Sequence, residues 1–257
     1  QYPFVLDIVG YNYSESRYDM DHKKYPERII FGSENRHEYK DWKAVRDKEF
    51  IFGQFLWTGI DYLGESGKWP SRGFYSGLLD LSGNIKPRGR FRQSLWSENP
   101  VIYIGTYPAP NTGKKTGLND VWSQMQSSSK KKDKKEKPSM DAWPVWNYED
   151  GELVRVVCYT NAASVQLLLN DKPVGNRKNF DDETGIIYWD LPYENGKLEA
   201  IGYDQSGKEI ARDIVRSSER PYAIKVENKN TVIDKNDGMA LVTAEIVDEN
   251  NTLVILA

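Results

Sequence analysis

The chain has 257 residues, with 35 Lys and Arg against 38 Asp and Glu, and this formal net charge of −3 gives no support to nucleic-acid binding. A single cysteine excludes an internal disulfide. The chain has only two histidines, which are too few to favour a histidine-based metal site or triad. We therefore predict no metal and no cofactor. No apolar run is long enough for a membrane span, and the length allows one large domain or two to three small ones.

Three apolar, β-rich runs in the first sixty residues alternate with polar segments. The runs cover residues 4–13, 28–35 and 50–57. The first connection, residues 14–26, can cross back as a short helix, and the second spaces apolar residues three or four apart, which predicts an amphipathic helix within residues 38–48. Because parallel neighbours need long connections, this order predicts parallel pairing.

Each run ends in polar or aromatic residues. The second run, Ile29-Ile-Phe31, predicts a strand buried on both faces, and Glu34 stands where that strand stops. Parallel strands end at one edge, so Tyr13 and Trp57 are expected beside Glu34. Aromatic faces stack on sugar rings and carboxylates bind sugar hydroxyls, so this edge suits a carbohydrate. Taken alone, Glu34 is more often a solvated loop acid.

Several motifs follow one another in order along the first hundred residues. They are Asp7-Ile-Val-Gly-Tyr-Asn-Tyr13, Tyr25-Pro26, Ile30-Phe-Gly-Ser-Glu34, Phe55-Leu-Trp-Thr-Gly-Ile-Asp-Tyr-Leu-Gly-Glu65, Gly77-Leu-Leu-Asp-Leu-Ser-Gly-Asn-Ile-Lys-Pro87 and Gln93-Ser-Leu-Trp96. Over roughly the first hundred residues the chain resembles the last part of the catalytic barrel of glycoside hydrolase family 2, and bacterial β-galactosidase-like members most. The resemblance implies the C-terminal part of a (β/α)8 TIM barrel and a carbohydrate substrate.

The resemblance also implies residue roles in a retaining exo-β-glycosidase. Glu34 matches the nucleophile, Tyr13 the tyrosine beside it, and Trp57 the tryptophan that floors the sugar subsite. Weaker candidates for hydroxyl contacts are Asn12, His37, Asp61 and Glu65. The family's acid/base is a Glu after the fourth barrel strand, upstream of anything in this sequence. We therefore expect residues 1–257 alone to be inactive.

Plainer interpretations stand beside these roles. Trp57 could be a core aromatic and Tyr13 a strand-end aromatic. Asp61 could satisfy backbone groups or an Arg such as Arg72 or Arg88, and Glu65 could be a solvated acid. Cys158 lies in an alternating strand, which suits a small buried side chain. Lys86-Pro87 is typical of a turn that starts a helix.

The second half changes character. Residues 127–139 hold serines and then mostly lysines, which predicts a mobile loop rather than a nucleic-acid or heparin patch. From Gly151, short strands alternate with turn signals, which favours an immunoglobulin-like β-sandwich. A further β segment begins near Pro221.

The sequence thus predicts an α/β part followed by all-β parts. The expected domains are residues 1–110 for the barrel portion, 111–143 for a linker, 144–218 for the sandwich and 219–257 for the truncated start of another sandwich. The predicted function is part of a retaining exo-β-glycosidase that cleaves terminal β-galactoside-type bonds. The alternative is a non-catalytic β-sandwich module that binds carbohydrate or protein. A periplasmic or secreted parent is favoured, and oligomeric state is left open.

Overall fold

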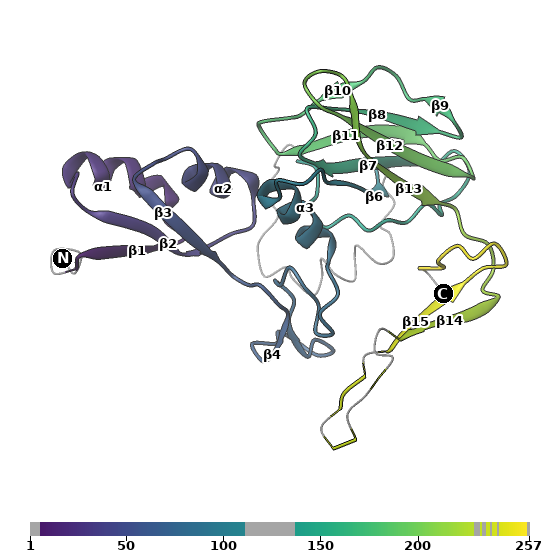
Figure 1. Cartoon of the computed structure of the whole chain (residues 1–257), viewed down its shortest axis with the longest axis horizontal. Helices are drawn as coiled ribbons and strands as arrows, with labels where there is room; N and C mark the ends of the chain where they lie inside the picture. Colours follow the sequence, from purple (N-terminus) through teal and green to yellow (C-terminus); the bar gives the residue numbers. More distant parts are fainter. Residues whose placement is uncertain are drawn as a thin grey trace.

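A computed structural model describes residues 6–110, 137–228, 232, 235–236, 238–240 and 242–255. Figure 1 shows a small sheet with helices beside it, then a β-sandwich, and finally a two-stranded hairpin at the C-terminal end. Most of the predicted mobile loop, residues 127–136, lies outside the described residues. Within those residues, no helix combines the length and the apolar character needed to cross a membrane.

The first sheet is parallel, as predicted. Its strands β1 (Ile8–Asn12), β2 (Ile29–Asn35) and β3 (Ile51–Leu56) stand in sequence order. The crossovers hold a short 3-10 helix, η2 (Glu15–Arg17), with helix α1 (Tyr18–Lys24), and then helix α2 (Tyr39–Arg46). Parallel neighbours need such connections, since each must return the chain to the same edge.

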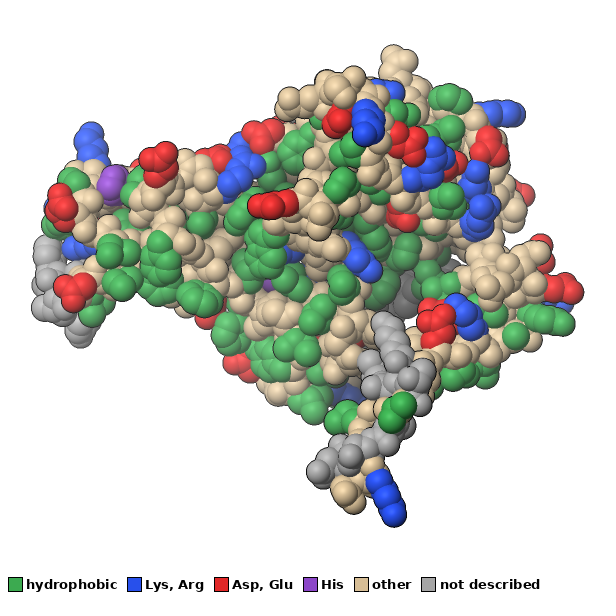
Figure 2. All heavy atoms as spheres, viewed as in Figure 1, with side chains coloured by type: hydrophobic (Ala, Val, Ile, Leu, Met, Phe, Trp, Pro, Cys, Tyr) green, Lys and Arg blue, Asp and Glu red, His purple; other side chains and the backbone are tan. Residues whose placement is uncertain are grey.

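Only one face of this sheet is well covered by the described residues. Tyr18, Ile30, Val45 and Ile51 form a small core under the helices. Ile29 is 47% exposed, so the prediction of a strand buried on both faces is wrong for the described structure. The physical reason is that the helices pack on one side of the sheet (Figure 1), while Phe52 and Phe55 stay exposed. Figure 2 shows hydrophobic side chains gathered at the surface of this part of the molecule. Three parallel strands are present, and the described residues contain no closed barrel.

A loop region joins this sheet to the sandwich. It contains the short strands β4 (Tyr62–Leu63) and β5 (Gly73–Phe74) and then helix α3 (Pro87–Trp96). Pro87 stands in the first turn of α3, as its fixed φ and missing N–H favour. The next strand, β6 (Ile102–Pro108), pairs with a strand beyond residue 150, so the predicted boundary at residue 110 divides one sheet of the sandwich.

The sandwich contains two antiparallel sheets, so the all-β, sandwich-like prediction is confirmed. One sheet has the order β11-β7-β6, and the other has the order β10-β8-β12-β13 with β9 against β8. The strands not yet bounded are β7 (Leu153–Thr160), β8 (Ser164–Leu169), β9 (Lys172–Pro173), β10 (Lys178–Asn179), β11 (Ile186–Pro192), β12 (Lys197–Tyr203) and β13 (Glu209–Arg216). Alternate residues of β7, including the buried Cys158, meet Leu167 and Leu198 in the core between the sheets.

The other face of β7 is also buried. There Val157 and Tyr159 pack with Phe91 of α3 and Tyr39 of α2 in a second core. A strand of a two-layer sandwich normally leaves one face to solvent. The burial of both faces of β7 therefore shows that the helices of the first part are packed against the sandwich.

The last described elements form a hairpin. Strands β14 (Ala223–Asn228) and β15 (Val242–Val247) pair antiparallel, and apolar side chains such as Ile224 and Val226 are exposed on it. Asp248 accepts three backbone N–H groups, from Glu219, Asn250 and Thr252, which fixes the turn after β15. The predicted start of a further sandwich corresponds to this two-stranded sheet.

Candidate active site

The ends of the three parallel strands bring the main predicted residues to one edge. Asn12 stands opposite Glu34 in the β1–β2 register, and Asn35 stands opposite Leu56 in the β2–β3 register. The backbone N–H of Tyr13 donates to Glu34 O over 2.8 Å, and that of Trp57 donates to Asn35 O over 3.2 Å. Three residues that are far apart in sequence are thus fixed around the end of β2.

The side chains of Tyr13 and Glu34 also interact. The pKa of the Tyr13 hydroxyl is raised, first by burial and then by its hydrogen bond to the Glu34 carboxylate and by the charge of that carboxylate. The phenol therefore stays protonated and can donate to Glu34. The guanidinium of Arg36 lies 4.7 Å from the centre of the Tyr13 ring, so a cation flanks the pair.

Trp57 has a partly exposed indole, with 36% of the residue accessible. Its ring meets Tyr62 edge-on at 6.0 Å, and the Tyr62 hydroxyl donates to Glu65 Oε2 over 2.5 Å. The pKa of Tyr62 is raised by desolvation, by Glu65 and also by the charge of Glu34, while a hydrogen bond from Trp57 opposes the rise. Tyr62 therefore contacts the indole of Trp57 and lies close enough to Glu34 to sense the charge of its carboxylate.

Tyr62 and Arg36 are residues of this site that the sequence reasoning missed as candidates. Tyr62 lies inside one of the family-like motifs, directly after Asp61, and Arg36 lies two residues after Glu34. Their positions close to stronger candidates were the available signal. Asn12 and Glu65 are exposed near the same edge, so both stay candidates for hydroxyl contacts.

His37 is buried, with 5% of the residue exposed, and lies beneath the edge rather than on it. Its Nε2 lies 3.0 Å from the backbone oxygen of Trp57, and Arg92 Nη2 donates to the backbone oxygen of His37 over 2.8 Å. Burial, followed by the charges of Arg88 and Arg92, lowers the pKa of His37 to about 4. The neutral imidazole therefore ties the end of β2 to the end of β3, and the predicted hydroxyl contact from His37 is not supported.

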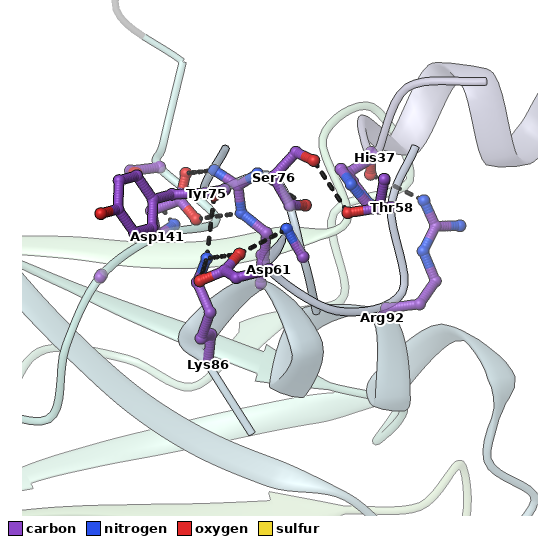
Figure 3. Close-up of polar contacts among 12 residues, drawn as sticks. His37, Thr58, Asp61, Tyr75, Ser76, Lys86, Arg92 and Asp141 are labelled. Atoms are coloured by element: carbon purple, nitrogen blue, oxygen red, sulfur yellow. Dashed lines mark hydrogen bonds and ion pairs between the residues drawn. The ribbon is translucent and has the colours of Figure 1, made fainter. Parts of the chain in front are cut away.

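Asp61 is also buried, at 3% exposed. Lys86 Nζ lies 2.8 and 3.0 Å from its two carboxylate oxygens, and the Gly77 backbone N–H donates to Oδ1 over 2.8 Å (Figure 3). Both oxygens are thus used inside the protein. The plainer expectation, that Asp61 satisfies backbone groups and a basic side chain, is the better description, although the cation is Lys86 rather than Arg72 or Arg88.

The described residues offer no group of three or more His, Cys, Asp or Glu placed to hold a metal ion. The edge presents the Glu34 carboxylate with a phenol donor, an exposed cation and a partly open indole, and the exposed Glu65 carboxylate lies near them. Such a group can bind a polar ring, place its anomeric carbon against an oxygen nucleophile and support that nucleophile electrostatically.

Comparisons with known proteins add three kinds of match. Residues 151–211 match a family described as a domain of unknown function, DUF4982. The β-galactosidase BoGH2A of Bacteroides ovatus is 29% identical over 225 residues, which are 85% of this chain and 21% of that protein. A β-glucuronidase of Formosa agariphila is 30% identical over 107 residues, which are 40% of this chain and 11% of that protein.

Solved structures agree with these relatives. A glycosyl hydrolase family 2 member from Bacteroides cellulosilyticus matches with a TM-score of 0.77 and 28% identity, over 98% of this chain and 31% of that one. A β-glycosidase from Bacteroides vulgatus shares the fold with a TM-score of 0.74 at 20% identity, over 96% of this chain and 36% of that one. The chain spans about a fifth of the length of the curated β-galactosidase it matches. Together with the motifs at the strand ends, these matches identify the chain as a homologue of part of the glycoside hydrolase family 2 β-glycosidases.

Proposed function

We propose that this chain supplies the nucleophile side of the active site of a retaining exo-β-glycosidase that cleaves terminal β-galactoside-type bonds. The observation that carries the proposal is the contact of Tyr13 with Glu34 through both backbone and side chains, at a strand end next to Trp57. The β-galactosidase relative supports the choice of sugar. The three parallel strands would then be the last part of a (β/α)8 barrel.

In this reaction a carboxylate oxygen of Glu34 attacks the anomeric carbon, and the bond from that carbon to the leaving oxygen breaks. A second carboxyl group, about 5 Å from the nucleophile in retaining enzymes, protonates the leaving oxygen. The same group then takes a proton from water, whose oxygen displaces Glu34 and frees the sugar. By resemblance, the second group is the Glu after the fourth barrel strand of the parent enzyme.

Tyr13 and Trp57 would support different parts of the cycle. The Tyr13 hydroxyl, kept protonated beside Glu34, holds one carboxylate oxygen and leaves the other free to attack. It can also stabilise the carboxylate when the glycosyl–enzyme ester breaks. The exposed part of Trp57 offers an apolar surface against which the face of a sugar ring can stack. Asn12 and Glu65 are the remaining candidates for hydroxyl contacts.

A second substrate class, the β-glucuronides, is favoured by one specific residue. The exposed guanidinium of Arg36 lies against Tyr13, two positions after Glu34, where it could meet the carboxylate of a glucuronic acid. The Formosa relative named as a β-glucuronidase makes this class worth testing. Replacing Arg36 with Ala should then reduce turnover of a nitrophenyl β-glucuronide more than that of a nitrophenyl β-galactoside. Arg216→Ala, at an exposed position on β13, is the matched control.

The test of the proposal is covalent labelling of the intact parent enzyme. An activated fluorosugar of the galacto or glucurono type should form a stable ester, and peptide mapping should find it on Glu34. Labelling of another carboxylate would contradict the assignment. No labelling and no turnover in the intact parent would favour the alternative, a non-catalytic carbohydrate- or protein-binding module.

A further inference from the structure

A buried tyrosine of the sandwich fixes a short segment that leads into it. Tyr159, on β7, is 0% exposed. Its hydroxyl accepts the backbone N–H of Ala142 over 3.1 Å and donates to Ser139 O over 2.8 Å. The ring of Tyr103 stacks on it at 5.3 Å, and the Tyr103 hydroxyl donates to Ala142 O over 3.1 Å. Asp141, which lies between Ser139 and Ala142, is therefore in a segment that is held at both ends.

Asp141 reaches from this segment to helix α3. Its two oxygens accept Nε and Nη2 of Arg88, each over 2.6 Å, which is the paired geometry in which guanidinium and carboxylate match best (Figure 3). Arg88 is buried, and its Nη1 donates to the backbone oxygen of Ser76 over 3.2 Å. The carboxylate of Asp141 thus orients a buried cation whose third contact lies in the loop before α3.

That loop is bound directly to the residues after Trp57. Ser76 Oγ and Thr58 Oγ1 lie 2.9 Å apart, and the backbone N–H of Leu78 donates to Gly59 O over 3.0 Å. Figure 3 shows Thr58 and Ser76 side by side, with Asp141 on one side of them and His37 on the other. A continuous series of contacts therefore runs from Tyr159 through the segment that holds Asp141, then through Arg88 and Ser76, to Thr58, the residue next to Trp57.

We infer that the sandwich, whose residues 151–211 match a family of unknown function, acts as a brace for the substrate-binding loop of the catalytic part. Asp141 and Arg88 are positioning residues. They keep Ser76 and Thr58 in place, and Trp57 then presents its indole to the sugar. This inference rests on the proposed function, because it assigns the loop a role in that reaction.

The sandwich and the first part of the chain also meet at a second contact, around Asp182, which provides a control for the experiment below. Asp182, in the loop between β10 and β11, accepts the Tyr39 hydroxyl over 2.6 Å and pairs with Lys43 Nζ at 2.5 Å. Both partners belong to α2. Within the described part of the chain, the side-chain partners of Asp182 all lie on α2, and none belongs to residues 57–61 or 75–78. Asp182 thus joins sandwich to helix without joining it to the loop of Trp57.

The experiment compares Asp141→Asn, Tyr159→Phe and Asp182→Asn in the intact parent enzyme. Trp57 contacts the sugar in the ground state and the transition state alike, so a displaced indole should raise KM about tenfold with a smaller change in kcat for Asp141→Asn. Tyr159→Phe keeps the ring and should move KM in the same direction by less. Asp182→Asn should leave KM unchanged. Fluorosugar labelling of Glu34 should stay stoichiometric in all three variants.

A double-mutant comparison decides whether the effect passes through Trp57. In a Trp57→Ala background, Asp141→Asn should cause no further rise in KM, because the group that it positions is gone. An unchanged KM for a folded Asp141→Asn, or equal effects of Asp141→Asn and Asp182→Asn, would overturn the inference. So would a full additional effect in the Trp57→Ala background. Glu34→Gln, measured beside them, separates the two claims: if it stays active, the proposed function fails, whatever the other variants do.

Discussion

The backbone N–H of Tyr13 donates to the backbone oxygen of Glu34 over 2.8 Å, and the Tyr13 hydroxyl is hydrogen-bonded to the carboxylate of the same residue. One residue therefore fixes both the strand end that carries the carboxylate and the carboxylate itself. Because the backbone contact does not depend on the phenol, the two functions of Tyr13 can be separated by mutation.

Glu34→Gln tests the nucleophile. Because Gln cannot form the glycosyl ester, turnover by the intact parent should fall by several orders of magnitude, about 10³-fold or more. Glu65→Gln removes a second carboxylate, which is exposed near the same edge, and should cost far less. Initial rates on nitrophenyl substrates measure both. A rate for Glu34→Gln close to that of the parent would exclude the assignment.

Tyr13→Phe removes the hydroxyl and keeps the ring and the backbone contact. We expect kcat to fall about tenfold to a hundredfold, which is less than a lost nucleophile costs, because a single hydrogen bond to the reacting carboxylate is removed. KM should change little. Tyr25→Phe, at a strand-flanking tyrosine that lies over Arg28, is the matched control. Equal effects of the two substitutions would argue against a direct role for the Tyr13 hydroxyl.

The meeting of Tyr13, Glu34 and Trp57 could be predicted from sequence because it needs only local patterns. Three apolar runs with long connections pair parallel, and parallel strands end at one edge. The register then places Asn12 opposite Glu34. The resemblance supplied the roles, but the spatial convergence followed from strand order alone.

The burial of His37 and Asp61 could not be predicted in the same way. Asp61 is paired with Lys86, 25 positions later, and the imidazole of His37 bonds the backbone oxygen of Trp57, 20 positions later. A polar residue after a strand looks the same in sequence whether solvent or a distant group of the protein satisfies it. The partner of β6 is equally hidden, since β7 begins about 45 residues beyond it, across residues that the structure does not describe.

His37 and Asp41 should affect stability in opposite directions as the pH falls from 7 to 4. Burial is the main reason that the pKa of His37 is lowered to about 4. Between pH 6.5 and 4, the unfolded state therefore binds a proton at His37 that the folded state does not bind. Stability is then lost on acidification. Burial, with the hydrogen bond and charge of Glu38, raises the pKa of Asp41 to about 7. The folded state binds that proton first, so stability is gained on acidification.

Urea denaturation of the intact enzyme at several pH values would show these contributions through two variants. Relative to the parent, His37→Gln should become steadily more stable as the pH falls from 6.5 to 4. Asp41→Asn should become steadily less stable between pH 7 and 4. In each case the change with pH in unfolding free energy, relative to the parent, should reach on the order of 3 kcal/mol, because each pKa unit corresponds to about 1.4 kcal/mol. A difference that does not vary with pH would rule out the assigned titration.

The buried pair of Asp61 and Lys86 should be strongly coupled. Replacing either partner alone, by Asp61→Asn or Lys86→Met, leaves one charge buried without its counterion and should cost about 3–5 kcal/mol of unfolding free energy. The double variant should cost clearly less than the sum of the two. The pair of the partly buried Lys197 with the exposed Asp171 is the control, and Asp171→Asn should cost far less than either change at the buried pair. Additive effects at Asp61 and Lys86 would show that the pair is not coupled.

Residues 1–257 expressed alone should not act as an enzyme. Glu34 can attack, but by resemblance the acid that protonates the leaving oxygen belongs to an earlier barrel strand of the parent, and no residue of this chain has been assigned that role. The described residues contribute three strands to the parallel sheet, and Ile8, Phe52 and Phe55 on these strands are each about half exposed or more. Such a sheet should associate rather than hold Glu34 firmly. The sandwich should fold regardless, because its two sheets close around their own core.

Purified residues 1–257 and the full-length parent should be assayed side by side on nitrophenyl β-galactoside. Turnover within about a hundredfold of the parent would be a loss of less than about 2.7 kcal/mol, smaller than the loss expected for a missing acid/base. That result would mean that the second catalytic group lies within this chain.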